Sequence, residues 1–171
     1  MKPAAPADPH ATDPAFRTHD HSHCQGDALA RAEDVAEQRG VRLTPVRRRA
    51  LEILLEAHRA MGAYEVLERL AADGFGHQPP VAYRALDFLV ENGLVHRIRR
   101  LNAFAACMHP GVAHAPVFLI CRSCDAVAET GGDAVRAALE QVATAQGFVI
   151  ERANVEALGL CPACAGKDAG C

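Results

Sequence analysis

The chain of 171 residues is 50% hydrophobic and 23% charged, the ordinary balance of a globular protein with one domain or two small ones. No apolar stretch reaches the ~18–20 residues of a membrane span, and the first residues lack the apolar region of a secretory signal, so we expect a cytoplasmic protein without a membrane partner. The net charge of −3 gives no general sign of nucleic-acid binding, although residues 28–104 carry twelve arginines against ten acidic residues, partly in clusters typical of phosphate contacts.

The N-terminal tail, residues 1–27, is expected to be disordered. Four prolines interrupt any helix in its first half, and apolar residues are too sparse to form a core. The tail ends in the run His-Asp-His-Ser-His-Cys over residues 19–24. This run can chelate metal transiently, and we interpret it as a segment of minor functional weight.

Four helices should follow. The first is expected from Asp27, a good N-cap residue, to Gly40, a good C-terminal stop. The second begins after Thr44, which precedes a proline, the third covers about 63–72, and the fourth covers 79–92, opened by two prolines. Apolar residues recur at helical spacing in each of the last three.

The apolar period then changes from helical to alternating. Residues 94–98 and 103–107 are expected to form two strands joined by a turn. A β-hairpin that directly follows helices predicts a winged helix-turn-helix domain over residues 28–107.

The rest of the chain predicts a second, smaller domain. Residues 108–116 contain two prolines and a glycine and indicate a hinge. A buried strand over 117–121, a possible partner strand over 126–130, an amphipathic helix and a strand over 148–158 follow. The expected fold class is therefore α+β, with a C-terminal α/β domain over 117–171.

Two Cys-x-x-Cys pairs lie in this second domain: Cys121, Cys124, Cys161 and Cys164. Such a turn aims two thiolates at one tetrahedral metal, and two turns complete a four-cysteine zinc site without an open position, which is structural rather than catalytic. Because the gap between the pairs holds a helix and a strand, the metal would join both ends of the domain. Chance pairing and redox dithiols are the alternatives.

Several motifs together resemble the Fur superfamily of metalloregulators. They are Pro-Pro-Val-Ala-Tyr-Arg-Ala-Leu-Asp-Phe-Leu-Val over 79–90, Arg-Leu-Thr-Pro over 42–45, and the knuckles at 121–124 and 159–164. The resemblance covers about residues 28–164, and residues 84–89 and 154–161 are most similar to the zinc-uptake-regulator branch. It implies a zinc-responsive repressor of zinc-uptake genes that binds palindromic AT-rich operator DNA as a homodimer. The C-terminal domain would form the dimer contact.

The resemblance also implies a regulatory metal site at His96, Cys107, His114 and Glu129. One thiolate, two imidazoles and one carboxylate suit tetrahedral zinc, and the thiolate argues against an iron-only site. The chain would then hold two Zn²⁺ ions per subunit, one structural and one regulatory. Taken singly, each residue has an ordinary alternative: a polar strand histidine, a small buried cysteine and a solvated glutamate.

Candidate DNA contacts lie on the expected helices. Arg84 and Tyr83 lie on the outer side of the fourth helix, and Arg84 can pair bidentately with guanine. Tyr64, which opens the third helix, matches a family DNA-contact position. Arg47 and Arg48 are candidate phosphate contacts, although arginines in this run can instead pair with nearby glutamates.

Other functions remain open at this point. A Fur-type regulator could sense iron, nickel or peroxide, but the hinge lacks the His-rich motif of the iron and peroxide sensors. An enzyme is not expected, because no Ser-His-Asp order, P-loop or HExxH motif is present, and neither is a small-molecule substrate. A zinc-storage or chaperone protein would not need a winged helix.

Overall fold

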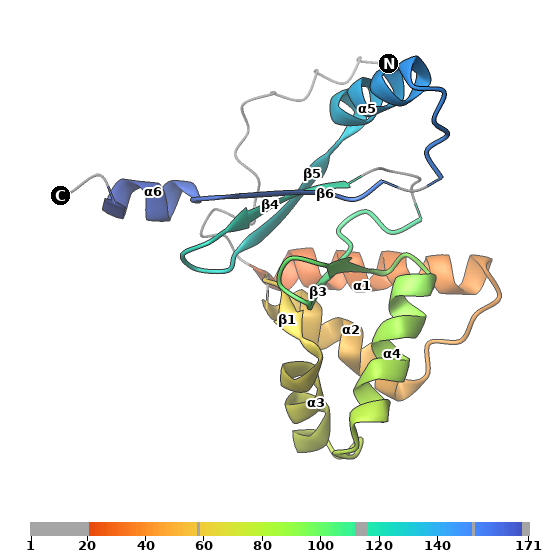
Figure 1. The fold of residues 1–171 in the computed structure, drawn as a ribbon. Helices are drawn as coiled ribbons and strands as arrows, with labels where there is room; N and C mark the ends of the chain where they lie inside the picture. Colours follow the sequence, from red (N-terminus) through yellow and green to blue (C-terminus); the bar gives the residue numbers. More distant parts are fainter. Residues whose placement is uncertain (1–20, 58, 112–115, 152, 169–171) are drawn as a thin grey trace, which may run out of the picture.

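A computed structural model describes residues 21–57, 59–111, 116–151 and 153–168 (Figure 1). The chain forms two halves that follow one another along the sequence, a helical N-terminal half with a small sheet and a C-terminal half built on a second sheet (Figure 1). Among the described residues, no helix is both long enough and apolar enough to cross a membrane.

Four helices build the N-terminal half: α1 His21–Gln38, α2 Pro45–Ala57, α3 Ala63–Ala72 and α4 Pro79–Glu91. Three of them begin and end close to the predicted residues. The first helix begins at His21 rather than at Asp27, so the end of the expected tail is helical. The last proline of the tail is Pro14, and nothing between His21 and Asp27 prevents the helix from extending.

Helix α4 shows why these bounds were predictable. Pro79 and Pro80 occupy its first turn, where a missing N–H leaves no hydrogen bond unmade. At the other end, the backbone N–H of Leu94 donates to the carbonyl oxygen of Leu89 at 2.9 Å, and Gly93 between them adopts φ +66°. This is the glycine-dependent turn that ends many helices and starts the next element in a fixed direction.

The wing is a three-stranded antiparallel sheet. Strands β2 (Val95–Ile98) and β3 (Ala103–Ala106) form the predicted hairpin, with His96 opposite Ala105. The short strand β1 (Met61–Gly62) adds to β3, so that the sheet order is β1-β3-β2. Two residues are too few to show an alternating pattern, and β1 was therefore not predicted.

The C-terminal half contains β4 (Pro116–Cys121), β5 (Val127–Gly131), α5 (Asp133–Ala145), β6 (Val155–Gly159) and α6 (Pro162–Asp168). Its sheet order is β5-β4-β6, with β4 antiparallel to β5 and parallel to β6. The strand predicted over 148–158 was too long at its start, because Phe148 and Val149 are exposed and only residues from Val155 onward pair with β4. Helix α6 was not predicted.

The two halves differ in their interiors. The N-terminal half has an apolar core of twenty buried residues drawn from all four helices and the wing. A second cluster lies where the halves meet and contains Ala60, Ile98, Ala103, Phe118, Ile120 and Val127. Since its members come from both halves, apolar burial holds the wing against the C-terminal sheet.

Candidate metal centres and DNA-binding surface

The four knuckle cysteines meet at one edge of the C-terminal sheet. Cys121 ends β4, Cys161 follows β6, and the parallel pairing of these strands places Cys121 opposite Gly159. The four sulfur atoms lie within 4.8 Å of one another. The distance from Cys124 Sγ to Cys161 Sγ is 3.8 Å. Tetrahedral zinc with Zn–S bonds near 2.3 Å requires S···S separations of about 3.8 Å, so the cluster fits zinc.

Backbone donors favour the thiolate form of one of these four cysteines, Cys121, whereas hydrogen bonds with neighbouring cysteines raise the pKa values of Cys124 and Cys164. The N–H of Cys161 donates to Cys121 Sγ at 3.4 Å and lowers the pKa of Cys121 to about 6. A lowered pKa favours the thiolate, which is the form that binds metal. Asp125 directly follows Cys124 and adopts φ +55°, which turns the chain sharply from the first cysteine pair into β5.

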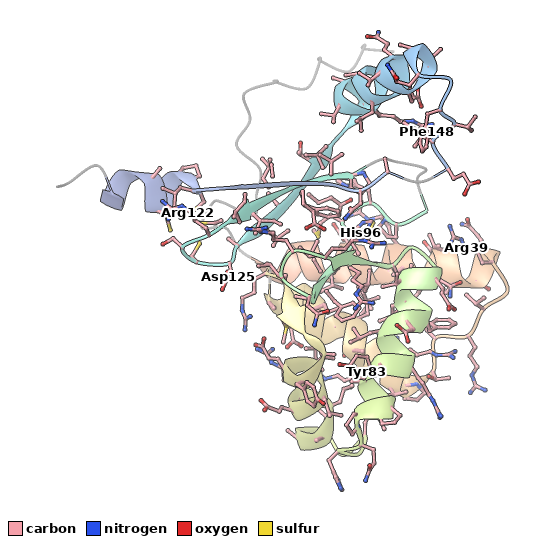
Figure 2. All side chains as sticks on the ribbon, in the orientation of Figure 1. Arg39, Tyr83, His96, Arg122, Asp125 and Phe148 are labelled. Carbon is pink, nitrogen blue, oxygen red and sulfur yellow. The ribbon has the colours of Figure 1, made fainter. Side chains whose placement is uncertain are left out.

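A second cluster brings together three of the four residues expected at the regulatory site. His96 comes from β2, Cys107 directly follows β3, and Glu129 lies on β5. Their ligand atoms lie within 4.8 Å of one another. The fourth expected residue, His114, lies outside the described residues, so its place remains a prediction. The three described ligands bridge the two halves, as Figure 2 shows for His96, which lies between the wing and the C-terminal sheet.

The distances in this cluster suit a mixed-ligand zinc site. His96 Nε2 lies 3.4 Å and Cys107 Sγ 3.9 Å from Glu129 Oε1. Tetrahedral zinc bonded to nitrogen, oxygen and sulfur requires about 3.4 Å between nitrogen and oxygen and about 3.6 Å between sulfur and oxygen. Small adjustments of the Cys107 side chain would therefore satisfy the metal.

The cluster is largely buried and its carboxylate is held in place. The side chain of Glu129 is 6% exposed, and its Oε2 accepts a hydrogen bond from the backbone N–H of Met108 at 3.1 Å. Burial and the nearby Glu129 charge raise the pKa of the Cys107 thiol to about 12. A buried thiol beside a carboxylate holds its proton until a cation replaces it, which makes metal binding release protons.

Sequence reasoning missed one neighbour of this cluster. The ring of Phe118, on β4, lies 5.2 Å from the imidazole of His96 between ring centroids. The contact fixes the histidine ring from the C-terminal side. No local pattern could have indicated it, because Phe118 has the pattern of an ordinary core residue of its strand.

Three of the predicted DNA contacts, Tyr64, Tyr83 and Arg84, lie on α3 and α4. Tyr64 is 64% exposed and Tyr83 is 40% exposed, and their rings meet edge to face with centroids 6.5 Å apart. Arg84 is exposed next to Tyr83, while Ala82, Ala85 and Leu86 bury the opposite side of α4. Two large exposed aromatic rings beside an exposed arginine on the expected recognition helix form a surface suited to contact another macromolecule.

The two candidate phosphate contacts differ. The guanidinium of Arg47 stacks on the ring of Phe88 at 3.6 Å and therefore lies against α4. Arg48 forms ion pairs with Glu33 of α1 and Glu52 of α2, as the alternative in the sequence analysis anticipated. Its charge is partly neutralised, which makes it the weaker candidate of the two.

A helical half with a wing is joined to a second sheet, with one cluster of metal ligands at the end of that sheet and another between the two halves, and this is the architecture of a metal-responsive regulator. The ferric uptake regulator family (FUR) matches residues 38–158, and the chain belongs to this family. It is therefore a regulator rather than an enzyme.

Zinc regulators are among the relatives that this chain matches. The zinc uptake regulation protein of Escherichia coli (strain K12) is 37% identical over 137 residues, which are 80% of each chain. A solved zinc uptake regulator complexed with zinc and DNA matches with a TM-score of 0.79 at 36% identity, over 85% of this chain and 97% of that one.

Two forms of a further relative, XcZur, match to different degrees. The holo form has a TM-score of 0.74 at 38% identity, over 83% of this chain and 99% of that one. The apo form has a TM-score of 0.50 at 39% identity, over 84% and 99%. The two forms are nearly equal in identity to this chain and differ in TM-score.

Proposed function

We propose that the chain is a zinc-responsive transcriptional repressor that acts in the cytoplasm, binds palindromic AT-rich operator DNA as a zinc-loaded homodimer and represses genes for zinc uptake. The observation that carries this proposal is the cluster of His96, Cys107 and Glu129, which spans the two halves at distances suited to zinc. The relatives named above support it, because they are zinc uptake regulators and one was solved with zinc and DNA.

We infer two zinc ions per subunit, and the two ligand clusters support this count. The knuckle cysteines would hold a structural ion, while His96, Cys107, Glu129 and the predicted ligand His114 would hold the regulatory ion. Zinc supplies a Lewis-acid centre without redox chemistry that accepts four donors tetrahedrally. The thiolate of Cys107 distinguishes this set from an all-oxygen or all-nitrogen iron site.

The regulatory ligands would act by joining two parts of the chain that, among the described residues, also meet through packing and hydrogen bonds. His96 and Cys107 belong to the wing, and Glu129 belongs to β5 of the C-terminal sheet. By holding one zinc ion together, these residues would fix the orientation of the DNA-binding half. The better match to the holo than to the apo form of XcZur supports a joined arrangement of this kind.

The proposed dimer uses apolar side chains that the C-terminal half leaves exposed. Helix α5 buries only Ala143, while exposed apolar residues line the helix and the segment after it: Val135, Leu139, Val142, Phe148 and Val149. Figure 1 shows α5 projecting away from the DNA-binding half, and Figure 2 shows Phe148 close to its end. Several large apolar side chains exposed along one helix and the segment after it are typical of a protein–protein interface.

In DNA recognition, Arg84 would read a guanine edge and Tyr64 and Tyr83 would contact sugars or thymine methyl groups. Arg47 is already positioned against the recognition helix for a phosphate contact. Arg48 would have to exchange its pairs with Glu33 and Glu52 for a phosphate. A dimer with a fixed separation of two recognition helices would match the two half-sites of a palindrome.

The test is operator binding by the purified dimer in buffers of fixed free zinc, measured by fluorescence anisotropy. The wild-type protein should bind more tightly as zinc rises. Cys107→Ser should lose this dependence while the zinc of its four-cysteine site stays bound, and Cys171→Ser, which changes a cysteine of neither cluster, should behave as wild type. Binding that is independent of zinc, or an unaffected Cys107→Ser, would refute the proposed regulatory site.

A further inference from the structure

A carboxylate of the C-terminal half reaches across to the tip of the wing. Glu156 lies on β6, and its Oε1 and Oε2 accept hydrogen bonds from the backbone N–H groups of Arg99 and Arg100, at 2.8 and 2.9 Å. Both N–H groups belong to the turn between β2 and β3. The contact therefore joins the second sheet to the turn of the wing.

The carboxylate is oriented by more than the wing. Asn154, two residues earlier, donates from Nδ2 to Oε1 of Glu156 at 2.7 Å. Although partial burial raises the pKa of Glu156, the N–H groups of Arg100 and Arg99 and the Asn154 amide together lower it below its ordinary value. The group is therefore charged at neutral pH, and charge-assisted hydrogen bonds of this kind are stronger than neutral ones.

The hairpin is thus held at both of its ends. His96 and Cys107 lie at its open end, where Cys107 N–H also donates to Leu94 O at 3.0 Å, and they meet Glu129 of β5. Glu156 holds the turn end against β6. The apolar cluster of Ile98, Ala103 and Phe118 packs between these two ends, and the two polar attachments add direction to a contact that apolar packing alone leaves free to slide.

We infer that Glu156 is a positioning residue that clasps the wing turn, so that metal at the His96–Cys107–Glu129 cluster sets one orientation of the DNA-binding half. This inference rests on the proposed function and names how its regulation is transmitted. Zinc at the cluster and operator DNA both favour the clasped arrangement. Weakening the clasp therefore weakens the binding of each, because each ligand must then also restore the arrangement that it prefers.

The main test compares Glu156→Gln with Glu151→Gln, an exposed glutamate before β6. Gln keeps the size of the side chain but retains only one acceptor oxygen and no charge. With the four-cysteine site loaded and no DNA present, chelator competition gives the zinc affinity of the regulatory site, and anisotropy gives operator affinity. Glu156→Gln should lower both by roughly three- to tenfold, the scale of a partly exposed charge-assisted hydrogen bond. Glu151→Gln should change neither.

Unchanged zinc and operator affinities in a folded Glu156→Gln protein would overturn the clasp. That result differs from failure of the proposed function, in which Cys107→Ser keeps zinc-dependent operator binding. A merely structural role for Glu156 would lower the melting temperature and leave the regulatory-site zinc affinity unchanged.

A second measurement needs no variant. Hydrogen exchange of the zinc-loaded wild-type dimer should show slow exchange of the Arg99 and Arg100 amides, comparable to paired strand amides, because both donate to Glu156. Exchange as fast as in an exposed turn would overturn the clasp even if Glu156→Gln fails to fold.

Discussion

The two halves of the molecule obtain their stability in different ways. The N-terminal half buries a core of side chains from α1, α2, α3, α4 and the wing. The C-terminal half leaves most of α5 exposed and, as proposed, relies on zinc at its four cysteines and on a second subunit. Under the proposed function, the DNA-reading surface therefore rests on a half with its own apolar core, while the half that would assemble and sense depends on metal.

The largest loss of stability is expected when the C-terminal half loses its structural zinc. Cys161→Ser should remove the structural zinc and unfold the C-terminal half, since structural zinc in small domains contributes on the order of 10 kcal/mol to folding. The N-terminal helices should persist. Circular dichroism, zinc content and size-exclusion chromatography of the variant measure this, with Cys171→Ser as the control. A zinc-depleted variant that remains a folded dimer would contradict the claim that the C-terminal half depends on zinc for its stability.

Truncation of a core residue in the N-terminal half should destabilise that half and leave the C-terminal half unaffected. Leu86 of α4 is fully buried, and Leu86→Ala should lower the free energy of unfolding of the N-terminal half by about 2–5 kcal/mol through the cavity left behind. Dimerisation and bound structural zinc should be retained. Thermal denaturation followed by probes in each half separates the two transitions. As a control, Leu139→Ala changes an exposed residue of α5 and should leave the melting temperature of the N-terminal half unchanged.

The third prediction concerns the exposed apolar face. Val142→Glu should weaken the proposed dimer by at least roughly thirtyfold, because a charge would be buried without a partner. Sedimentation equilibrium gives the dissociation constant. Arg136→Ala changes an exposed α5 residue that pairs with Glu140 and should leave it within a few-fold. An unchanged constant in Val142→Glu would place the dimer contact elsewhere.

The smallest of these effects is confined to function. Arg84→Ala should weaken binding of a zinc-loaded dimer to its operator by about 1–3 kcal/mol, roughly 5- to 150-fold, and should relax the preference at one base position. Its folding, zinc content and dimerisation should remain those of the wild type. Operator variants tested by anisotropy reveal the relaxed position. Equal weakening on all sequences would assign Arg84 to phosphate contact instead.

The parts of the fold that follow from local signals were predictable. Helices α3 and α4 carry apolar residues at helical spacing between glycine and proline signals, and the wing follows them with an alternating pattern. Helix α6 and the two-residue strand β1 were missed because neither is long enough to show a period. The start of α1 was missed because Asp27 resembles a cap but lies inside a continuous helix.

The candidate sites also differ in whether local sequence signals predict them. The cysteine spacing alone predicts the four-cysteine cluster, since each knuckle is local. The regulatory cluster draws ligands from β2, the end of β3 and β5, so only the family resemblance could assemble it before the structure did. Glu156 contacts residues 56 and 57 positions away along the chain, and no local pattern distinguishes it from any other strand glutamate.

The central claim is that one zinc ion at the His96–Cys107–Glu129 cluster and the operator favour the same arrangement of the two halves. Coupling of this kind is reciprocal, so the factor by which zinc tightens operator binding must equal the factor by which operator tightens zinc binding. The most direct test measures the regulatory-site zinc affinity by chelator competition with and without saturating operator. Equal factors of roughly 5- to 150-fold are predicted, and a zinc affinity that operator leaves unchanged would contradict the account.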